Sequence, residues 1–93
     1  SAVMVNNFSN HLYTLAKDYC AQHELDFKLL LPLIKETVER LEAGDPTDWQ
    51  TGPAIRNDEA TMQQHLQLLE SNPTLTNIYR LFSESIRAYY SSN

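Results

Sequence analysis

Several features are scarce in this 93-residue sequence, and each scarcity excludes a class of protein. The single cysteine, Cys20, cannot form a disulfide within the chain, and a reduced, cytoplasmic setting is the simplest expectation. The two glycines, Gly44 and Gly52, stand too far apart to form the glycine-rich fingerprint of a dinucleotide-binding loop. No run of about 18 apolar residues occurs, so we expect no segment that spans a membrane.

Basic residues are also few. Seven Lys and Arg stand against twelve Asp and Glu, which gives a net charge of −5. Because the basic residues are scattered and form no stripe, we expect no binding to nucleic acid. Metal binding is not expected either, since His and Cys nowhere occur at ligand spacing except for the lone pair Cys20 and His23.

A catalytic set is missing as well. Cys20 has no obvious base beside it, so we interpret it as a buried structural thiol. The carboxylates fall mostly on exposed helix faces or at helix caps, and none forms an acid and base pair. The chain therefore does not look like a self-contained enzyme, and its catalytic residues, if it has any, are unknown.

The sequence instead predicts a small all-α domain. Apolar residues recur at intervals of three and four, and neither an alternating strand pattern nor a hairpin signal is present. The predicted bundle has about four helices, with these bounds: Ala2–His23, Asp26–Ala43, Asn57 or Asp58 to Ser71, and Pro73 or Thr74 to Tyr90. Met62, His65, Leu66 and Leu69 are expected to line the inner side of the third helix.

The second predicted helix has clear boundary signals. Asp26 is a suitable N-cap and Gly44 a suitable C-terminal stop. Pro32 falls after the first predicted turn, where it should remove one backbone hydrogen bond and kink the helix. The run Leu29–Ile34 is apolar nearly all round, which predicts either the most deeply buried helix or one that faces another subunit.

The first predicted helix carries an unusual polar stripe beside its apolar face. Asn7, Asn10, His11 and Thr14 follow the spacing of one helix face, yet Asn, His and Thr are poor helix formers. A solvated face normally carries Lys, Glu or Gln. The stripe is therefore either a surface selected for contacts or an ordinary solvent face.

The segment Thr51–Asp58 is a long connection for a helical bundle, and it allows two interpretations. In one, Gly52 and Pro53 form a turn, Asp58 caps the third helix, and Arg56 is solvated or pairs with Asp58. In the other, Gly52 lets the backbone approach a ligand, and Arg56 presents its guanidinium to a carboxylate or phosphate near a helix N-terminus. His65, on the third helix, is either a hydrogen-bonded packing residue or a catalytic one.

Several short runs resemble a single family. They are Asn7-Phe8, Asn10-His11-Leu12-Tyr13, Leu30-Leu31-Pro32-Leu33-Ile34 with Thr37, Gln50-Thr51-Gly52-Pro53, Arg56-Asn57-Asp58 and His65-Leu66. Together they resemble DUF2520, a C-terminal domain of unassigned function found in Rossmann-like NADP oxidoreductases, over nearly the whole chain. The most specific element is the Thr-Gly-Pro run with the following Arg-x-Asp and His-Leu. The family more often has glycine where this chain has Asn57.

The resemblance implies a helical domain similar to the C-terminal domains of 6-phosphogluconate dehydrogenase-like proteins and pyrroline-5-carboxylate reductases. Residues 1–93 would then form one dimerisation domain of a homodimer. The N-terminal Rossmann domain, absent from this sequence, would bind most of the NADP, and the chain alone would need no cofactor. A small-molecule substrate would lie in the cleft between the two domains. The cleft residues that it implies are Asn7, Asn10, His11, Thr51, Gly52, Pro53, Arg56, Asp58 and His65.

Two further expectations complete the prediction. The sequence begins without an initiator methionine and enters helical periodicity at once, so we expect a piece of a longer protein. The alternative to an oxidoreductase domain is a non-catalytic helical module whose apolar excess serves only self-association.

Overall fold

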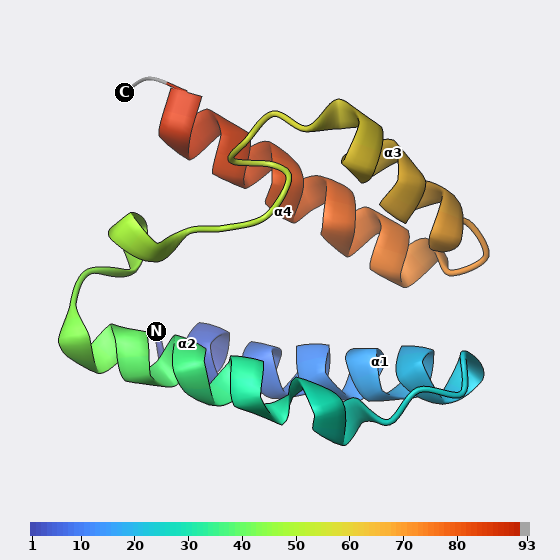
Figure 1. Ribbon diagram of the computed structural model, residues 1–93, viewed down its shortest axis with the longest axis horizontal. Helices are drawn as coiled ribbons and strands as arrows, with labels where there is room; N and C mark the ends of the chain where they lie inside the picture. Colours follow the sequence, from blue (N-terminus) through green and yellow to red (C-terminus); the bar gives the residue numbers. More distant parts are fainter. Residues whose placement is uncertain (92–93) are drawn as a thin grey trace. The chain divides into compact units, whose positions relative to one another are not determined.

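The computed structural model describes residues 1–91, and every regular element among them is helical (Figure 1). Four α-helices and no strand occur in this range, which confirms the predicted all-α class. The chain divides into two compact units, the first from Ser1 to Asp45 and the second from Pro46 onward. Each unit is described separately below.

The first unit contains two helical segments joined by a short turn. Its elements are a π-helical stretch, η1 (Val3–Phe8), then α1 (Ser9–Gln22), a 3-10 turn, η2 (Phe27–Leu30), and α2 (Leu31–Ala43). η2 packs against α1. Since η1 continues directly into α1, the predicted helix Ala2–His23 is confirmed in extent, although its first turns are wider than α-helical ones.

Helix α1 ends in a Schellman motif. The backbone N–H of Leu25 donates to the carbonyl of Cys20 at 2.8 Å, and that of Glu24 donates to Ala21 at 3.3 Å. Glu24 itself has a φ of 57°, in the left-handed region that favours glycine. The helix therefore ends here at the cost of a strained glutamate, and the sequence gives no glycine signal for this stop.

The start of α2 corrects two predictions. Pro32 does not kink the helix, because α2 begins at Leu31 and places the proline in its first turn, where no backbone hydrogen bond is lost. Asp26 is a cap as predicted, but it caps η2, by accepting a hydrogen bond from the backbone N–H of Lys28. The helix is also not deeply buried, since Leu29, Leu31 and Leu33 are all exposed. Gly44 ends it, as predicted.

The second unit is an antiparallel helix pair preceded by a loop. It contains a 3-10 turn, η3 (Pro46–Trp49), then α3 (Glu59–Leu68) and α4 (Pro73–Ser91). Arg87 pairs with Glu59, Tyr79 bonds to His65, and Thr76 Oγ1 donates to the carbonyl of Leu69 at 2.7 Å. From one contact to the next, the residue number increases along α3 and decreases along α4. The two helices therefore run side by side in opposite directions (Figure 1).

Of the second helix pair, α4 keeps its predicted bounds to within one residue, whereas α3 is shorter than predicted at both ends, since it begins at Glu59 and not at Asn57 or Asp58. α4 matches its prediction, and the side chain of Asn72 caps it by accepting from the backbone N–H of Leu75 at 3.1 Å. α3 ends at Leu68, three residues before the predicted Ser71. Met62 is buried, and His65, Leu66 and Leu69 are half-buried, which confirms the predicted inner side of α3.

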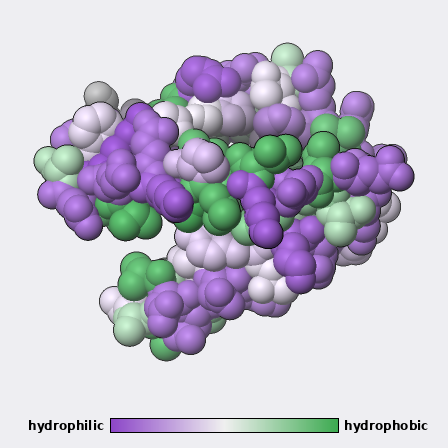
Figure 2. Space-filling model, turned by 60° about the horizontal axis from the view of Figure 1, so that its bottom comes forward, coloured by the Kyte–Doolittle hydropathy of each residue, from purple (hydrophilic) through white to green (hydrophobic). Residues whose placement is uncertain are grey.

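Apolar side chains remain exposed in both units. Among residues 1–91, only Cys20, Ala54 and Met62 are buried, so Cys20 is indeed a buried thiol. On α2 the exposed apolar residues include Leu33, Val38 and Leu41, and on α4 they include Leu81, Phe82 and Tyr89. Figure 2 shows such apolar surface, in green, between polar side chains. These faces are available for further contacts.

Replacing Glu24 by glycine should stabilise the protein. The left-handed backbone destabilises a non-glycine residue by about 1–2 kcal/mol, and glycine avoids this strain. Glycine loses more conformational entropy on folding, which offsets about 0.5–1 kcal/mol of the gain. We therefore expect Glu24→Gly to raise the free energy of unfolding by about 0.5–1 kcal/mol, measured by urea denaturation.

The matched control is Glu39→Gly in the interior of α2, where glycine should lower stability by about 1 kcal/mol. If Glu24→Gly lowers stability as much as Glu39→Gly does, Glu24 does not have the left-handed backbone described here for the end of α1.

Candidate functional site

The nine predicted cleft residues are distributed over both units. Three lie in the first unit and six in the second; in chain order they are Asn7, Asn10, His11, Thr51, Gly52, Pro53, Arg56, Asp58 and His65.

The polar stripe of the first unit lies at the surface. Asn7, Asn10 and His11 are all exposed, and within residues 1–91 none of their side chains has a hydrogen-bond partner. Asn7 belongs to the π-helical η1, so the α-helical spacing that aligned it with Asn10 does not apply to it. The amide and imidazole groups of the stripe thus face solvent, while the hydroxyl of its fourth member, Thr14, donates to the backbone carbonyl of Asn10 at 3.3 Å.

The loop of the second unit is one turn of helix closed by a second Schellman motif. The backbone N–H of Asp58 donates to the carbonyl of Pro53 at 2.9 Å, and that of Asn57 donates to Ala54 at 3.2 Å. Asn57 has a φ of 54°, a conformation that asparagine tolerates and glycine adopts freely. The glycine that is more common at this position in the resembling family suits the same backbone.

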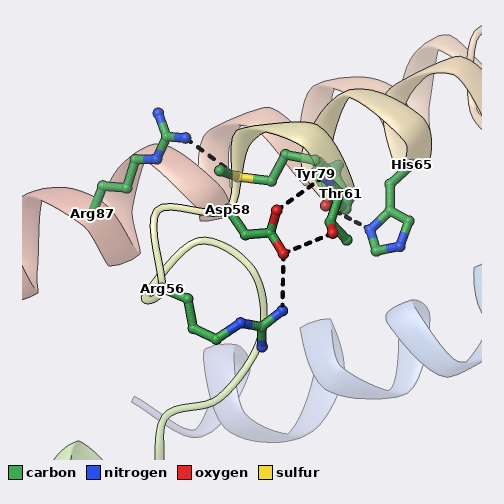
Figure 3. A network of polar contacts seen from close by, with 7 residues as sticks. Arg56, Asp58, Thr61, His65, Tyr79 and Arg87 are labelled. Carbon is green, nitrogen blue, oxygen red and sulfur yellow. Dashed lines mark hydrogen bonds and ion pairs between the residues drawn. The ribbon is translucent and has the colours of Figure 1, made fainter.

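Asp58 joins this turn to α3. Its carboxylate accepts from the backbone N–H of Thr61 at 3.2 Å and from the Thr61 hydroxyl at 2.7 Å (Figure 3). These bonds from Thr61 hold the pKa of the Asp58 carboxyl below its ordinary value, with a smaller contribution from the neighbouring Arg56. The predicted cap is therefore confirmed, and the N-terminus of α3 is already occupied by this carboxylate.

Arg56 is only loosely engaged. Its guanidinium Nη2 lies 3.5 Å from Asp58 Oδ2, and 58% of its side chain is exposed. A pair at this distance and exposure contributes little to stability. Most of the donor fork of Arg56 therefore faces solvent, where it can meet an anion.

Gly52 is required for its backbone angle and not for space. Its φ is 100°, and a Cβ at this position would meet no atom within 4 Å. No other part of the protein packs closely against the Gly52 backbone. The space in front of that backbone is open.

His65 and Tyr79 form the link between α3 and α4. The imidazole Nδ1 lies 2.8 Å from the Tyr79 hydroxyl, and the two rings meet edge to face. Burial raises the pKa of the Tyr79 phenol, and the charge of Asp58 raises it further, so the hydroxyl keeps its proton. Asp58, Thr61 and His65 follow the spacing of one face of α3, and Figure 3 shows them with Arg56 and Tyr79 as one polar row.

An open apolar groove lies beside this row in the same unit. It has a volume of about 300 Å³ and runs between Thr51–Ala54 and α4. Phe82 and Ile86 contribute apolar wall, while Thr51, Gly52 and Pro53 are the candidate residues that line it. Tyr79 also lines the groove, so it belongs both to the groove and to the polar row.

Sequence reasoning missed Tyr79 as a site residue. Spacing along one helix does not show the pairing of α3 with α4 that brings Tyr79 to His65. No group of three or more His, Cys, Asp or Glu side chains within residues 1–91 is placed to hold a metal ion. In the same range, no helix is long and apolar enough to cross a membrane.

Comparison with known proteins agrees with the resemblance found in the sequence. The model of the family described as "Domain of unknown function (DUF2520)" matches residues 1–86. The chain is also similar to the crystal structure of a protein described as "putative NADP oxidoreductase BF3122 from Bacteroides fragilis", with 41% identity and a TM-score of 0.89. The match covers 94% of this chain and 34% of that chain, so the present chain spans about a third of its length. The sequence matches no curated protein.

The capping role of Asp58 predicts a pH-dependent contribution to stability. Because folding lowers the pKa of this carboxyl from 3.8, the contribution is complete above that value and is lost as the pH falls through the lower folded value. Urea denaturation should show wild type more stable than Asp58→Asn at pH 6, with the difference shrinking towards pH 2.

Thr61→Val tests the cause of this dependence. It removes the hydroxyl that bonds to Asp58 and should weaken the pH dependence without abolishing it. A difference between wild type and Asp58→Asn that stays constant with pH would contradict the proposed pKa shift.

Proposed function

Because the chain belongs to the DUF2520 family, we propose that it is the dimerisation and substrate-cleft domain of an NADP-dependent oxidoreductase. The observation that carries the proposal is its 41% identity, over 94% of its length, to the protein described as "putative NADP oxidoreductase BF3122". The chain corresponds to only a third of that protein, so a larger part of the enzyme lies outside it.

The chain's own residues do not fit NADP. A dinucleotide needs a glycine-rich loop that lets backbone N–H groups reach the pyrophosphate, and the chain has only Gly44 and Gly52. The helix N-terminus nearest to Arg56 in the chain, that of α3, is already capped by Asp58. We therefore assign NADP to an N-terminal Rossmann domain of the same protein, and we assign to this chain a role in holding the substrate.

The polar row supports a small substrate with a carboxylate or carbonyl oxygen. Arg56 offers an exposed planar donor fork, which suits a carboxylate, and His65 offers a second polar group on the same unit. The apolar groove beside them suits a short hydrocarbon part. Asn7, Asn10 and His11 expose polar groups on the first unit and are proposed separately as substrate contacts of that unit.

The exposed apolar faces support dimerisation. Leu33 on α2 is 62% exposed and Phe82 on α4 is 52% exposed, although both belong to apolar stripes. Exposed apolar surface of this kind marks interfaces with other proteins. The same observation favours the alternative function, a helical module that only associates with itself, and enzyme activity separates the two.

The proposed enzyme activity is tested on the longer protein that contains this chain. This protein should bind NADPH, as measured by fluorescence quenching or calorimetry. It should also reduce at least one small 2-oxo acid or aldehyde acid. Removing the charged donor with Arg56→Ala should lower kcat/KM about 10- to 100-fold, the range for a lost hydrogen bond to a charged group.

Arg80→Ala is the matched control, because Arg80 is also exposed but lies outside the polar row. It should leave kcat/KM within about twofold. Absence of NADPH binding, together with an Arg56→Ala variant that changes only stability, would show that the oxidoreductase assignment is wrong.

The second prediction concerns self-association. The chain should sediment as a dimer at micromolar concentration, and Leu33→Glu should shift it towards monomer because it places a charge on an exposed apolar face. Lys35→Glu, on the same helix at an exposed polar position, should remain dimeric.

Circular dichroism should show equal helix content in both variants, so that loss of the dimer is not confused with unfolding. A wild-type chain that is monomeric at these concentrations would contradict the proposed dimerisation.

A further inference from the structure

The imidazole of His65 is bonded on one side only. Its Nδ1 lies 2.8 Å from the Tyr79 hydroxyl. Its Nε2 has no partner within residues 1–91 and is not among the buried polar atoms left without one. Figure 3 shows that this nitrogen points away from Tyr79. The half-buried ring therefore turns one nitrogen to Tyr79 and the other to the surface of the unit.

The direction of the hydrogen bond follows from the partners that are present. The Tyr79 hydroxyl has no other hydrogen bond within the described residues, and a phenol is both a donor and an acceptor. If Nδ1–H donated to the phenol oxygen, the phenol proton would have no partner in a partly buried position. If the phenol donates to Nδ1, this proton is satisfied and the ring carries its own proton on Nε2.

Two features of the surroundings are compatible with the phenol as donor. The pKa of Tyr79 is raised by burial and by the negative charge of Asp58, so the hydroxyl stays protonated and has a proton to donate. The ring of Tyr79 also lies in the wall of the apolar groove, and α4 holds it in place. The donor is thus fixed in position.

We infer that Tyr79 is a positioning residue, which fixes His65 in the tautomer that presents Nε2–H as a hydrogen-bond donor to a carbonyl or carboxylate oxygen of the substrate. This inference rests on the proposed function for the identity of the acceptor. When a fixed partner bonds to one ring nitrogen of a histidine, here Nδ1, the other nitrogen, here Nε2, is held in one orientation and one protonation state. His65 then acts on the substrate, and the Tyr79 hydroxyl acts only through His65, while the Tyr79 ring lines the groove.

The tautomer is measured by ¹⁵N correlation spectra of the histidine rings, recorded in alkaline buffer so that the neutral rings are observed. In the wild-type chain, the Nε2–H form of His65 should predominate. Tyr79→Phe keeps the ring and removes the hydroxyl, and the tautomer ratio should fall about fivefold, the value for one ordinary hydrogen bond. A purely structural tyrosine would change stability without this shift.

Tyr89→Phe is the matched control. Tyr89 is an exposed tyrosine of the same helix whose ring contacts Tyr90, and the loss of its hydroxyl should leave the His65 ratio unchanged. A wild-type His65 in the Nδ1–H form, or a ratio that Tyr79→Phe does not alter, would overturn the inference.

The acceptor is tested with pyruvate, which carries both a ketone and a carboxylate. Added to the full-length protein, it should shift the Nε2 resonance of His65 in a saturable way, while His23 serves as the internal reference. Tyr79→Phe should require several-fold more pyruvate. A His65 shift that is absent, or that only parallels the shift of His23, would overturn the donor role. The tautomer ratio is measured without nucleotide. The positioning of His65 by Tyr79 can therefore be confirmed even if the protein does not bind NADPH and the proposed function is wrong.

Discussion

The carboxylate of Asp58 is the constraint on which the candidate site of the second unit depends. The backbone N–H of Asp58 closes the Schellman motif of the preceding turn. The Asp58 carboxylate caps α3 by accepting hydrogen bonds from the backbone N–H and the hydroxyl of Thr61. One residue thus ends one helical turn and starts the next. Because the start of α3 is fixed in this way, the register of its inner face is fixed too, and this places His65 opposite Tyr79.

The same arrangement separates two kinds of surface within one unit. The polar row follows α3 from its cap to His65, while the apolar groove lies between the loop and α4. Tyr79 contributes its hydroxyl to the first and its ring to the second. A molecule with a charged or carbonyl group and a short hydrocarbon part suits such a pair of neighbouring surfaces. The chain has no glycine-rich phosphate loop, and its described residues form no cluster of three or more potential metal ligands.

Local signals in the sequence predicted the helices well. Asn72 and Pro73, Gly44 and Asp58 mark helix boundaries, and the structure places boundaries there. Pro32 misled the prediction because the same residue suits either a kinked helix or the first turn of a new one, and the choice depends on whether Phe27–Leu30 is α-helical or 3-10. The end of the first helix was predicted, but the left-handed backbone of Glu24 was not, since a glutamate in this region carries no sequence signature. The left-handed backbone of Asn57 was not predicted either, since Asn57 was a candidate for the start of the third helix, although asparagine and glycine both suit this conformation.

The sequence by itself determined the all-α class, several helix boundaries and the family to which the chain belongs, because these depend on residues within a few positions of one another and on matching motifs. It also placed Arg56, Asp58 and His65 among the candidates. Only the tertiary structure decided that His65 bonds to Tyr79, that Asp58 already occupies the start of α3 and that Gly52 borders an open groove. Spacing along a helix decides which side chains share a face, but it does not decide which face of another helix lies opposite; packing of the two helices makes that choice.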